Sequence, residues 1–182
     1  MRACPRVHLV RRGEPFMTLA RAIVGQQISV KAAQSVWDRV IACVGDCTPQ
    51  AVLRREPRSL RACGLSDRKT EYIVDLARRF DRGLVHPHRW PALSDEEIIA
   101  DLVQVRGIGR WTAEMFLIFN LLRPDVFPLD DLGLQAALRR HYFGGRRTSP
   151  ARMRRLGEQW APWRSVATWY LWRSLDPLPV EY

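Results

Sequence analysis

Apolar residues recur every three or four positions along most of the chain, which is the spacing of one face of an α-helix. The first stripe ends on the polar Gln27, after Phe16, Leu19, Ala20, Ile23 and Val24. A second helix is expected from about Val30 to Val44, ending near Gly45. A middle helix is marked by Tyr72, Ile73, Leu76 and Phe80.

Polar residues mark further helix starts. Thr48-Pro49 and Ser149-Pro150 each place a capping hydroxyl before a proline at the first helical position, and residues 94–97 read as a capping box. Strict alternation never persists, and clusters of β-branched residues are absent. The pattern predicts an all-α, compact helical domain of about ten helices over residues 1–182. The Gly83 to Pro91 stretch is the best linker candidate, so two lobes with a cleft are expected, joined near 81–93.

Composition narrows the class of protein. The chain has 182 residues, is 47% hydrophobic and carries a net charge of +10, enough for one globular core and an attraction to nucleic acid or an acidic membrane. Only Lys31 and Lys69 are lysines, so the cations are almost all arginine, and codon composition is an alternative explanation for part of this excess. No apolar run reaches the roughly 18 residues that span a bilayer. We expect a soluble, monomeric protein in the cytoplasm or bacterial nucleoid, whose four cysteines (Cys4, Cys43, Cys47 and Cys63) are reduced thiols.

One glycine-rich turn carries most of the chemistry. Gly107 and Gly109 lie between two helical patterns, in a hairpin of about residues 98–122. Two glycines this close allow a tight turn near a ligand, and the second opens a helix whose free N–H groups attract an anion. Arg106 and Arg110 flank the turn, which favours a nucleic-acid phosphate. The alternative is an ordinary corner between helices that needs glycine only for its geometry.

Four motifs in order resemble one family. LVQVRGIGRWTA (102–113) resembles the helix-hairpin-helix of DNA glycosylases, and VFPLDDLGLQ (126–135) resembles the Gly/Pro-rich loop and aspartate that complete it. AIVGQQISVKAA (22–33) and WAPWRSVATWYLWR (160–173) resemble the 3-methyladenine DNA glycosylase II branch. The likeness covers about residues 14–175. It implies the helix-hairpin-helix (HhH-GPD) fold and an enzyme that flips and excises alkylated purines from double-stranded DNA, starting base excision repair.

The resemblance implies that Asp131 is the catalytic carboxylate. Cleavage of an N-glycosidic bond builds positive charge on the sugar, which an ionised carboxylate stabilises while it orients or deprotonates water. Helical spacing does not separate Asp130 from Asp131, since both align with Leu134. The family places its aspartate second in the pair, so Asp131 takes the chemistry and Asp130 is expected to cap the next helix.

Trp111 occupies the position at which bifunctional relatives carry a lysine that forms a Schiff base with the sugar. The resemblance therefore implies a monofunctional enzyme that uses water and leaves an abasic site. Trp111, Trp172 and Met115 are expected to line the base pocket, where an indole face attracts a cationic base. Met115 replaces a tyrosine found in some members. In the last helix we expect a core stripe of Trp163, Val166, Ala167, Tyr170 and Leu171, with Trp172 on a neighbouring face; core packing is the alternative for Trp172.

The DNA contacts implied by the resemblance are Gln27, Ser29, Gly107, Gly109 and Arg110. Gln27 would be the wedge that fills the gap left by the flipped base, with Ser29 beside the minor groove. Alternatively, Gln27 bonds to backbone at a helix end, and Ser29 is an N-cap. The resemblance also implies a structural alkali ion held by the carbonyls of Val103, Val105 and Ile108. No iron–sulfur cluster is expected, because no cysteine follows Cys63.

Two other functions compete with this interpretation. One is a non-catalytic helix-hairpin-helix module that senses lesions; a carboxylate after a proline-containing loop argues against it. The other is a glycosylase-lyase for oxidised bases, against which Trp111 argues.

Overall fold

The computed structural model describes residues 9, 11 and 13–175, and this part of the chain contains ten α-helices, one 3₁₀-helix and no strand. The all-α prediction is therefore confirmed. The described residues divide between two compact units. The N-terminal unit comprises residues 13–113, and the C-terminal unit includes residues 114–175. The division at 113/114 lies within one helix, α7 (Arg110–Phe119).

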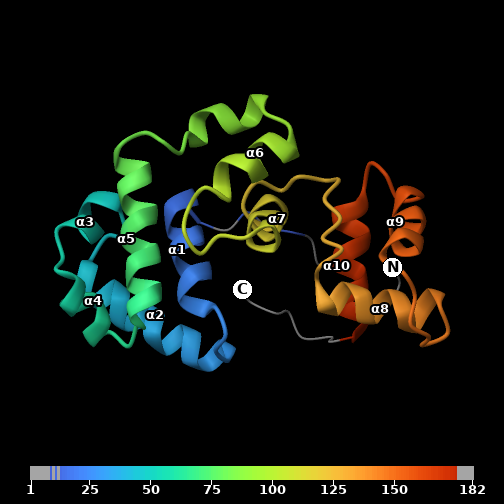
Figure 1. Ribbon diagram of the computed structural model, residues 1–182, viewed down its shortest axis with the longest axis horizontal. Coiled ribbons are helices and arrows are strands. Elements are labelled where there is room, and N and C mark those ends of the chain that lie inside the picture. The colour runs from blue at the N-terminus through green and yellow to red at the C-terminus, as the bar shows by residue number, and fades with distance from the viewer. Residues whose placement is uncertain (1–8, 10, 12, 176–182) are drawn as a thin grey trace. The chain divides into compact units, whose positions relative to one another are not determined.

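The N-terminal unit is built around helix α5 (Asp67–Asp81), which lies between α1 (Pro15–Gly25) and the short helices α3 (Pro49–Leu53) and α4 (Pro57–Ala62) (Figure 1). Helix α2 (Val30–Val44) packs against α1 and α4. The apolar stripe expected at the start of the chain is buried on α1, from Phe16 to Val24. Burial of that face against α5 fixes the direction in which α1 ends.

Local sequence signals set where these helices begin. Thr48 and Ser149 each accept a hydrogen bond from the backbone N–H three residues on, so both are N-caps. At the start of α6 (Asp95–Leu102), Ser94 and Glu97 form the complete capping box. These three predictions are confirmed, because a cap depends only on residues within one turn of each other.

The stretch expected to join two lobes lies inside the N-terminal unit. It forms a 3₁₀-helix, Pro87–Ala92, labelled η1. Val85 and Trp90 are buried, and the Trp90 indole N–H donates to Asp101 of α6 at 3.4 Å. Proline and glycine thus mark a bend whose apolar side chains enter the core of this unit.

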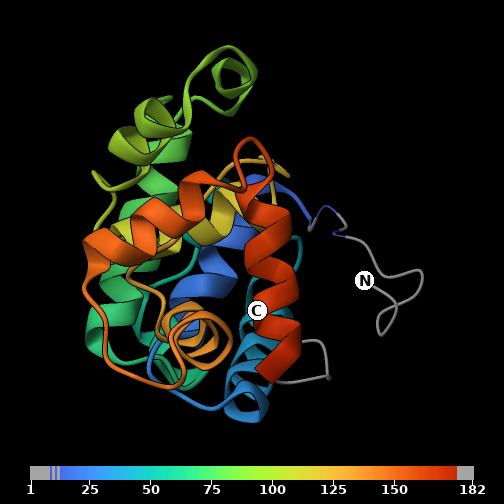
Figure 2. The ribbon, with the colours of Figure 1, turned by 90° about the vertical axis from the view of Figure 1, so that its right-hand side faces the viewer.

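The C-terminal unit holds α8 (Leu132–Tyr142), α9 (Pro150–Glu158) and α10 (Arg164–Leu175). In Figure 2, α8 is seen nearly end-on beside α10, against which it packs. Their buried cluster consists of Leu134, Ala137, Leu138, Met153 and Leu171. This core fixes the N-terminus of α8 relative to α10.

The predicted core stripe of α10 is confirmed at Leu171 and wrong at Trp163 and Val166. Its buried residues are Ser165, Thr168 and Leu171, whereas Trp163 and Val166 are 61% and 39% exposed. The reason is polar: the Ser165 hydroxyl accepts from the Val126 N–H at 2.9 Å and donates to the Arg123 carbonyl at 2.6 Å. Those bonds turn the small polar face of the helix inward.

Two further expectations concern the chain as a whole. Cys43, Cys47 and Cys63 are free thiols, while Cys4 lies outside the described residues. Burial raises the pKa of Cys47 to about 11. Within the described ranges, no helix has both the length and the apolar character needed to cross a bilayer.

Candidate functional site

The hairpin turn between α6 and α7 is held by main-chain and side-chain bonds. Val105 N–H donates to Leu102 O, and Ile108 N–H donates to Val105 O, both at 3.1 Å. Gly107 has φ +83°, and a Cβ there would stand 2.2 Å from Cδ2 of Tyr72 on α5. Glycine is therefore required twice over, for the backbone and for the ring beside it. Asp75 of α5 accepts the Arg106 N–H at 3.0 Å, which ties the turn to the middle helix.

Gly109 differs from Gly107. A Cβ at Gly109 would meet no heavy atom within 4 Å, so its missing side chain leaves the start of α7 open to approach. Arg110, expected to contact DNA, is paired with Glu96 of α6, with one N–O distance of 2.9 Å. That hydrogen bond lowers the pKa of the Glu96 carboxyl. Both side chains are exposed, so a phosphate would compete with Glu96 for the guanidinium.

The three carbonyls expected to hold an alkali ion lie along this turn. Val105 O accepts the Ile108 N–H, whereas the Val103 and Ile108 carbonyls accept no hydrogen bond from the described part of the chain. Carbonyl oxygens are suitable ligands for hard cations. Two of the three carbonyls thus fit the expected ion, and the third is shared with an N–H.

The turn after α1 carries the two other residues expected at DNA. Gln27 has φ +58°, is exposed and makes no side-chain hydrogen bond with the described residues. Ser29 is the N-cap of α2, and its hydroxyl accepts the Ala32 N–H at 3.3 Å. The capping alternative for Ser29 is therefore present. The helix-end alternative for Gln27 is not, because the side chain at the tip of the turn points to no backbone group.

Sequence reasoning missed the side chains that hold this turn. Gln26 Nε2 donates to the Gly107 carbonyl at 2.8 Å, which joins the turn after α1 to the hairpin turn. Lys69 Nζ of α5 donates to the Val24 carbonyl in the last turn of α1, also at 2.8 Å, and partial burial lowers the pKa of this amine. Both bonds connect residues more than 40 positions apart, so no local pattern could have revealed them.

Asp131 lies at the N-terminus of α8 in the C-terminal unit. Its side chain is buried, with 7% exposure. One carboxylate oxygen, Oδ1, accepts the Leu134 N–H at 2.5 Å and the Trp172 indole N–H at 2.7 Å. Two donors from different helices therefore fix the orientation of the carboxylate.

The expected division of roles between Asp130 and Asp131 is wrong in one respect. Asp131 itself is the N-cap of α8, whereas Asp130 is exposed one residue earlier. The cap position must have extended backbone and reach the third residue of the helix, and Asp131 at φ −71°, ψ 120° meets both conditions. Gly133 was also missed: a Cβ there would stand 3.2 Å from Asp131 Oδ1 and 3.3 Å from Trp172 Cδ1.

Trp172 is a partner of Asp131 and packs on an aromatic ring. Its indole stacks on Phe119, with ring centroids 5.8 Å apart and planes 18° from parallel. The loop that leads to Asp131 is anchored to the start of α10, because Arg164 forms a two-point ion pair with Asp125 at 2.7 and 2.8 Å. That pair lowers the pKa of the Asp125 carboxyl.

The two remaining pocket residues lie four positions apart on α7. Met115 is buried with 7% exposure and belongs to the C-terminal unit, whereas Trp111 is partly buried and belongs to the N-terminal unit. Every residue from 112 to 120 is buried. Of the three residues expected in the base pocket, Trp172 bonds to Asp131 through its indole N–H.

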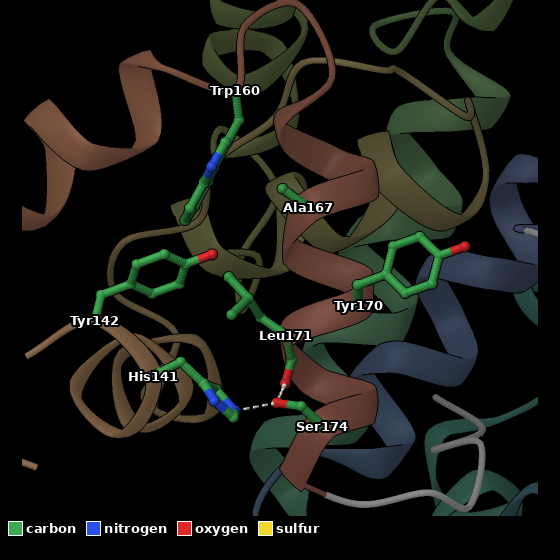
Figure 3. A pocket seen from close by; sticks show the side chains of 7 residues that line it. All are labelled: His141, Tyr142, Trp160, Ala167, Tyr170, Leu171 and Ser174. Atoms are coloured by element: carbon green, nitrogen blue, oxygen red, sulfur yellow. Dashed lines mark hydrogen bonds between the residues drawn. The ribbon is translucent and has the colours of Figure 1, made fainter. Parts of the chain in front are cut away.

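A separate hollow of about 420 Å³ lies between the C-terminal end of α8 and the side of α10 (Figure 3). Tyr142 and Trp160 face each other across it with ring centroids 5.5 Å apart, and His141 is hydrogen-bonded to Ser174 at 2.8 Å. None of the residues expected in the base pocket lines this hollow.

Comparison with known proteins identifies the family. A family model described as HhH-GPD superfamily base excision DNA repair protein matches residues 20–162. DNA-3-methyladenine glycosylase 1 of Schizosaccharomyces pombe is 38% identical over 91% of this chain and 74% of its own length. The Bacillus subtilis protein YfjP is 32% identical over 88% of this chain, which spans only 59% of that relative.

A solved structure agrees with these sequence matches. The chain resembles the Schizosaccharomyces pombe 3-methyladenine DNA glycosylase Mag1, solved in complex with abasic DNA, with a TM-score of 0.81 and 34% identity. The match covers 97% of this chain and 88% of Mag1. The chain belongs to the HhH-GPD superfamily of base excision DNA repair proteins.

Proposed function

We propose that this chain is a monofunctional DNA glycosylase that excises alkylated purines, such as 3-methyladenine, by hydrolysing the N-glycosidic bond. The carrying observation is the buried Asp131 carboxylate, held by the Leu134 N–H and the Trp172 indole on a chain of this family. A carboxylate fixed in orientation before the reaction can stabilise positive charge on the sugar with little reorganisation. The names of the relatives support the substrate class.

Other residues would bind the DNA backbone, fill the space left by the base and contact the base. The open backbone at Gly109 and the exposed Arg106 and Arg110 suit a duplex phosphate, and Gln27 suits the space left by a flipped base. An alkali ion on the carbonyls of Val103, Val105 and Ile108 would add positive charge beside that phosphate. Trp111, Met115 and Trp172 are our candidates for contact with the base.

Each competing function meets a specific obstacle. A non-catalytic DNA-binding module needs an N-cap at α8, but it does not need that capping carboxylate to be buried and to accept the Trp172 indole N–H as well. A glycosylase-lyase needs an amine nucleophile, and the hairpin position that carries one in bifunctional relatives is Trp111. Lys69 is a candidate amine nucleophile because its pKa is lowered, but its amine donates a hydrogen bond to Val24 O.

Product chemistry tests the proposal. The protein is incubated with methylated duplex DNA, and one half of the sample receives borohydride while the other receives mild alkali, which cuts abasic sites; a sample without protein is treated in the same way. We expect alkali to cut the strand at the vacated sugar and borohydride to trap almost no protein–DNA adduct. Efficient adduct formation would overturn the monofunctional assignment, and its loss in Lys69→Arg would identify the amine. The absence of alkali-labile sites would favour the binding module.

A further inference from the structure

The turn at residues 26–29 is held at both sides of Gln27, but not at Gln27 itself. Ser29 is fixed as the N-cap of α2, and Gln26 is fixed by its bond to Gly107 O at 2.8 Å. Between them, Gln27 adopts φ +58°. A left-handed conformation costs a non-glycine residue about 1–2 kcal/mol, so its neighbours must maintain it.

The Gln26 bond joins two turns that have different tasks in the proposed function. Gly107 is the glycine of the hairpin turn, whose own position is fixed by the Tyr72 ring and by Asp75 through Arg106 N–H. Lys69, on the same helix as Tyr72 and Asp75, holds the last turn of α1 through Val24 O. Helix α5 therefore holds Val24, and the hairpin turn holds Gln26, so the residues before Gln27 are fixed by two separate bonds.

We propose that Gln26 is a positioning residue that locks the Gln27 turn to the hairpin turn, so that gripping the DNA backbone and wedging the base stack become one rigid-body event. This inference rests on the proposed function, in which the hairpin binds a phosphate and Gln27 is the wedge. Extruding a base costs a few kcal/mol of stacking and pairing. If the turn that carries Gln27 were loose, the turn would move when it met the base stack, and the base would stay in place. The bond from Gln26 to Gly107 is therefore needed for extrusion of the base but not for DNA binding.

The proposed role of Gln26 explains why two glutamines, Gln26 and Gln27, occur side by side in this turn. The side chain of Gln26 is partly buried and is used inside the protein, whereas that of Gln27 is exposed and left for the ligand. The two residues differ in backbone conformation as well, with φ −58° at Gln26 and +58° at Gln27. Two adjacent glutamines thus have different tasks: the side chain of Gln26 bonds within the protein, and that of Gln27 is exposed to solvent.

The test uses Gln26→Leu, which keeps the size of the side chain and removes the donor, and Gln26→Lys, which restores a donor. Gln50→Leu is the matched control, because Gln50 makes one side-chain bond of the same length, to Asp81, elsewhere in the same unit. Three quantities are measured on the full chain: affinity for undamaged duplex, fluorescence of 2-aminopurine beside a lesion, and single-turnover base release. The fluorescence and the base release are each measured with the lesion in a normal pair and in a mispair.

For Gln26→Leu we expect affinity for undamaged DNA within about twofold of the native chain and base release from the normal pair lowered about tenfold, the upper range for one net hydrogen bond. A mispaired lesion is easier to extrude, so there the deficit should shrink to about threefold or less. The 2-aminopurine signal should fall in parallel with base release, Gln26→Lys should recover most of both, and Gln50→Leu should match the native chain.

Several results would overturn the inference. An equal loss on paired and mispaired lesions would assign Gln26 a general structural role, and a loss of affinity would place it in DNA binding instead. Should Gln26→Leu melt well below the native chain, Lys69→Met tests the second fastening with Gln26 intact and must show the same pair-dependent deficit. If the native chain extrudes 2-aminopurine-flanked bases but releases none, the proposed function fails while the lock remains measurable.

Discussion

In the N-terminal unit, long side chains reach across the fold to main-chain atoms: Gln26 to Gly107 O, Lys69 to Val24 O, and Asp75 to Arg106 N. In the C-terminal unit the direction is reversed, since the backbone of Leu134 and the indole of Trp172 converge on one side-chain carboxylate, Asp131. The bonds of the N-terminal unit hold two turns in place, whereas those of the C-terminal unit fix the orientation of one negative charge. We infer that changes in the N-terminal unit alter DNA binding or extrusion of the base, whereas changes around Asp131 alter cleavage of the glycosidic bond.

Asp131→Asn should produce the largest effect. We expect base release to fall about 10²–10³-fold, the loss typical for removal of one electrostatic stabiliser of a transition state. Asparagine caps a helix about as well as aspartate, so the melting temperature and abasic-DNA affinity should change little. Single-turnover rates, thermal melts and binding isotherms on the same preparation check all three, and near-native base release would remove Asp131 from the chemistry.

Trp172→Phe should come next. Phenylalanine keeps an aromatic ring against Phe119 but loses the N–H donated to Asp131, and hydrogen bonds to charged groups contribute about 1.5–3 kcal/mol. Base release should fall about tenfold or more with unchanged affinity for undamaged DNA. Trp169→Phe is the control, because Trp169 packs on Tyr170 and Arg173 instead. An equal loss in both variants would mean that α10 matters only as a packing element.

Gly107→Val and Gly109→Val test the N-terminal unit, in which both glycines lie. At Gly107 a side chain meets Tyr72 and a left-handed φ, so thermal stability and DNA affinity should fall together. At Gly109 the side chain enters open space, so affinity alone should fall, about tenfold, equally on damaged and undamaged DNA. Binding titrations over a range of salt should also show a shallower slope for Gly109→Val. Unchanged affinity at Gly109 would move the phosphate contact elsewhere.

Asp130→Asn should have the smallest effect. Its side chain is exposed and Asp131 supplies the cap, so stability should stay within about 0.5 kcal/mol of native and base release within about twofold. Thermal melts and rates measured beside those of Asp131→Asn would expose an exchanged assignment of the two carboxylates.

The sequence predicts what is local. The caps at Thr48, Ser94 and Ser149 and the stripe of α1 depend on residues within a few turns, and all are confirmed. The inward face of α10 was predicted correctly at Leu171 but not at Ser165, because Ser165 is buried by bonds to a loop 39 and 42 residues earlier. For the same reason, the bond from Gln26 to Gly107, 81 residues away, leaves no trace in periodicity or spacing.

The most direct test of the central claim is the identity of the released base. Methylated duplex DNA is incubated with the native chain and with Asp131→Asn, and the free bases are separated by chromatography. We expect methylated purines from the native chain and almost none from the variant, although both bind the DNA. Equal amounts of free base from the two proteins, or DNA binding by the native chain with no base released, would contradict the assignment of a glycosylase that depends on Asp131.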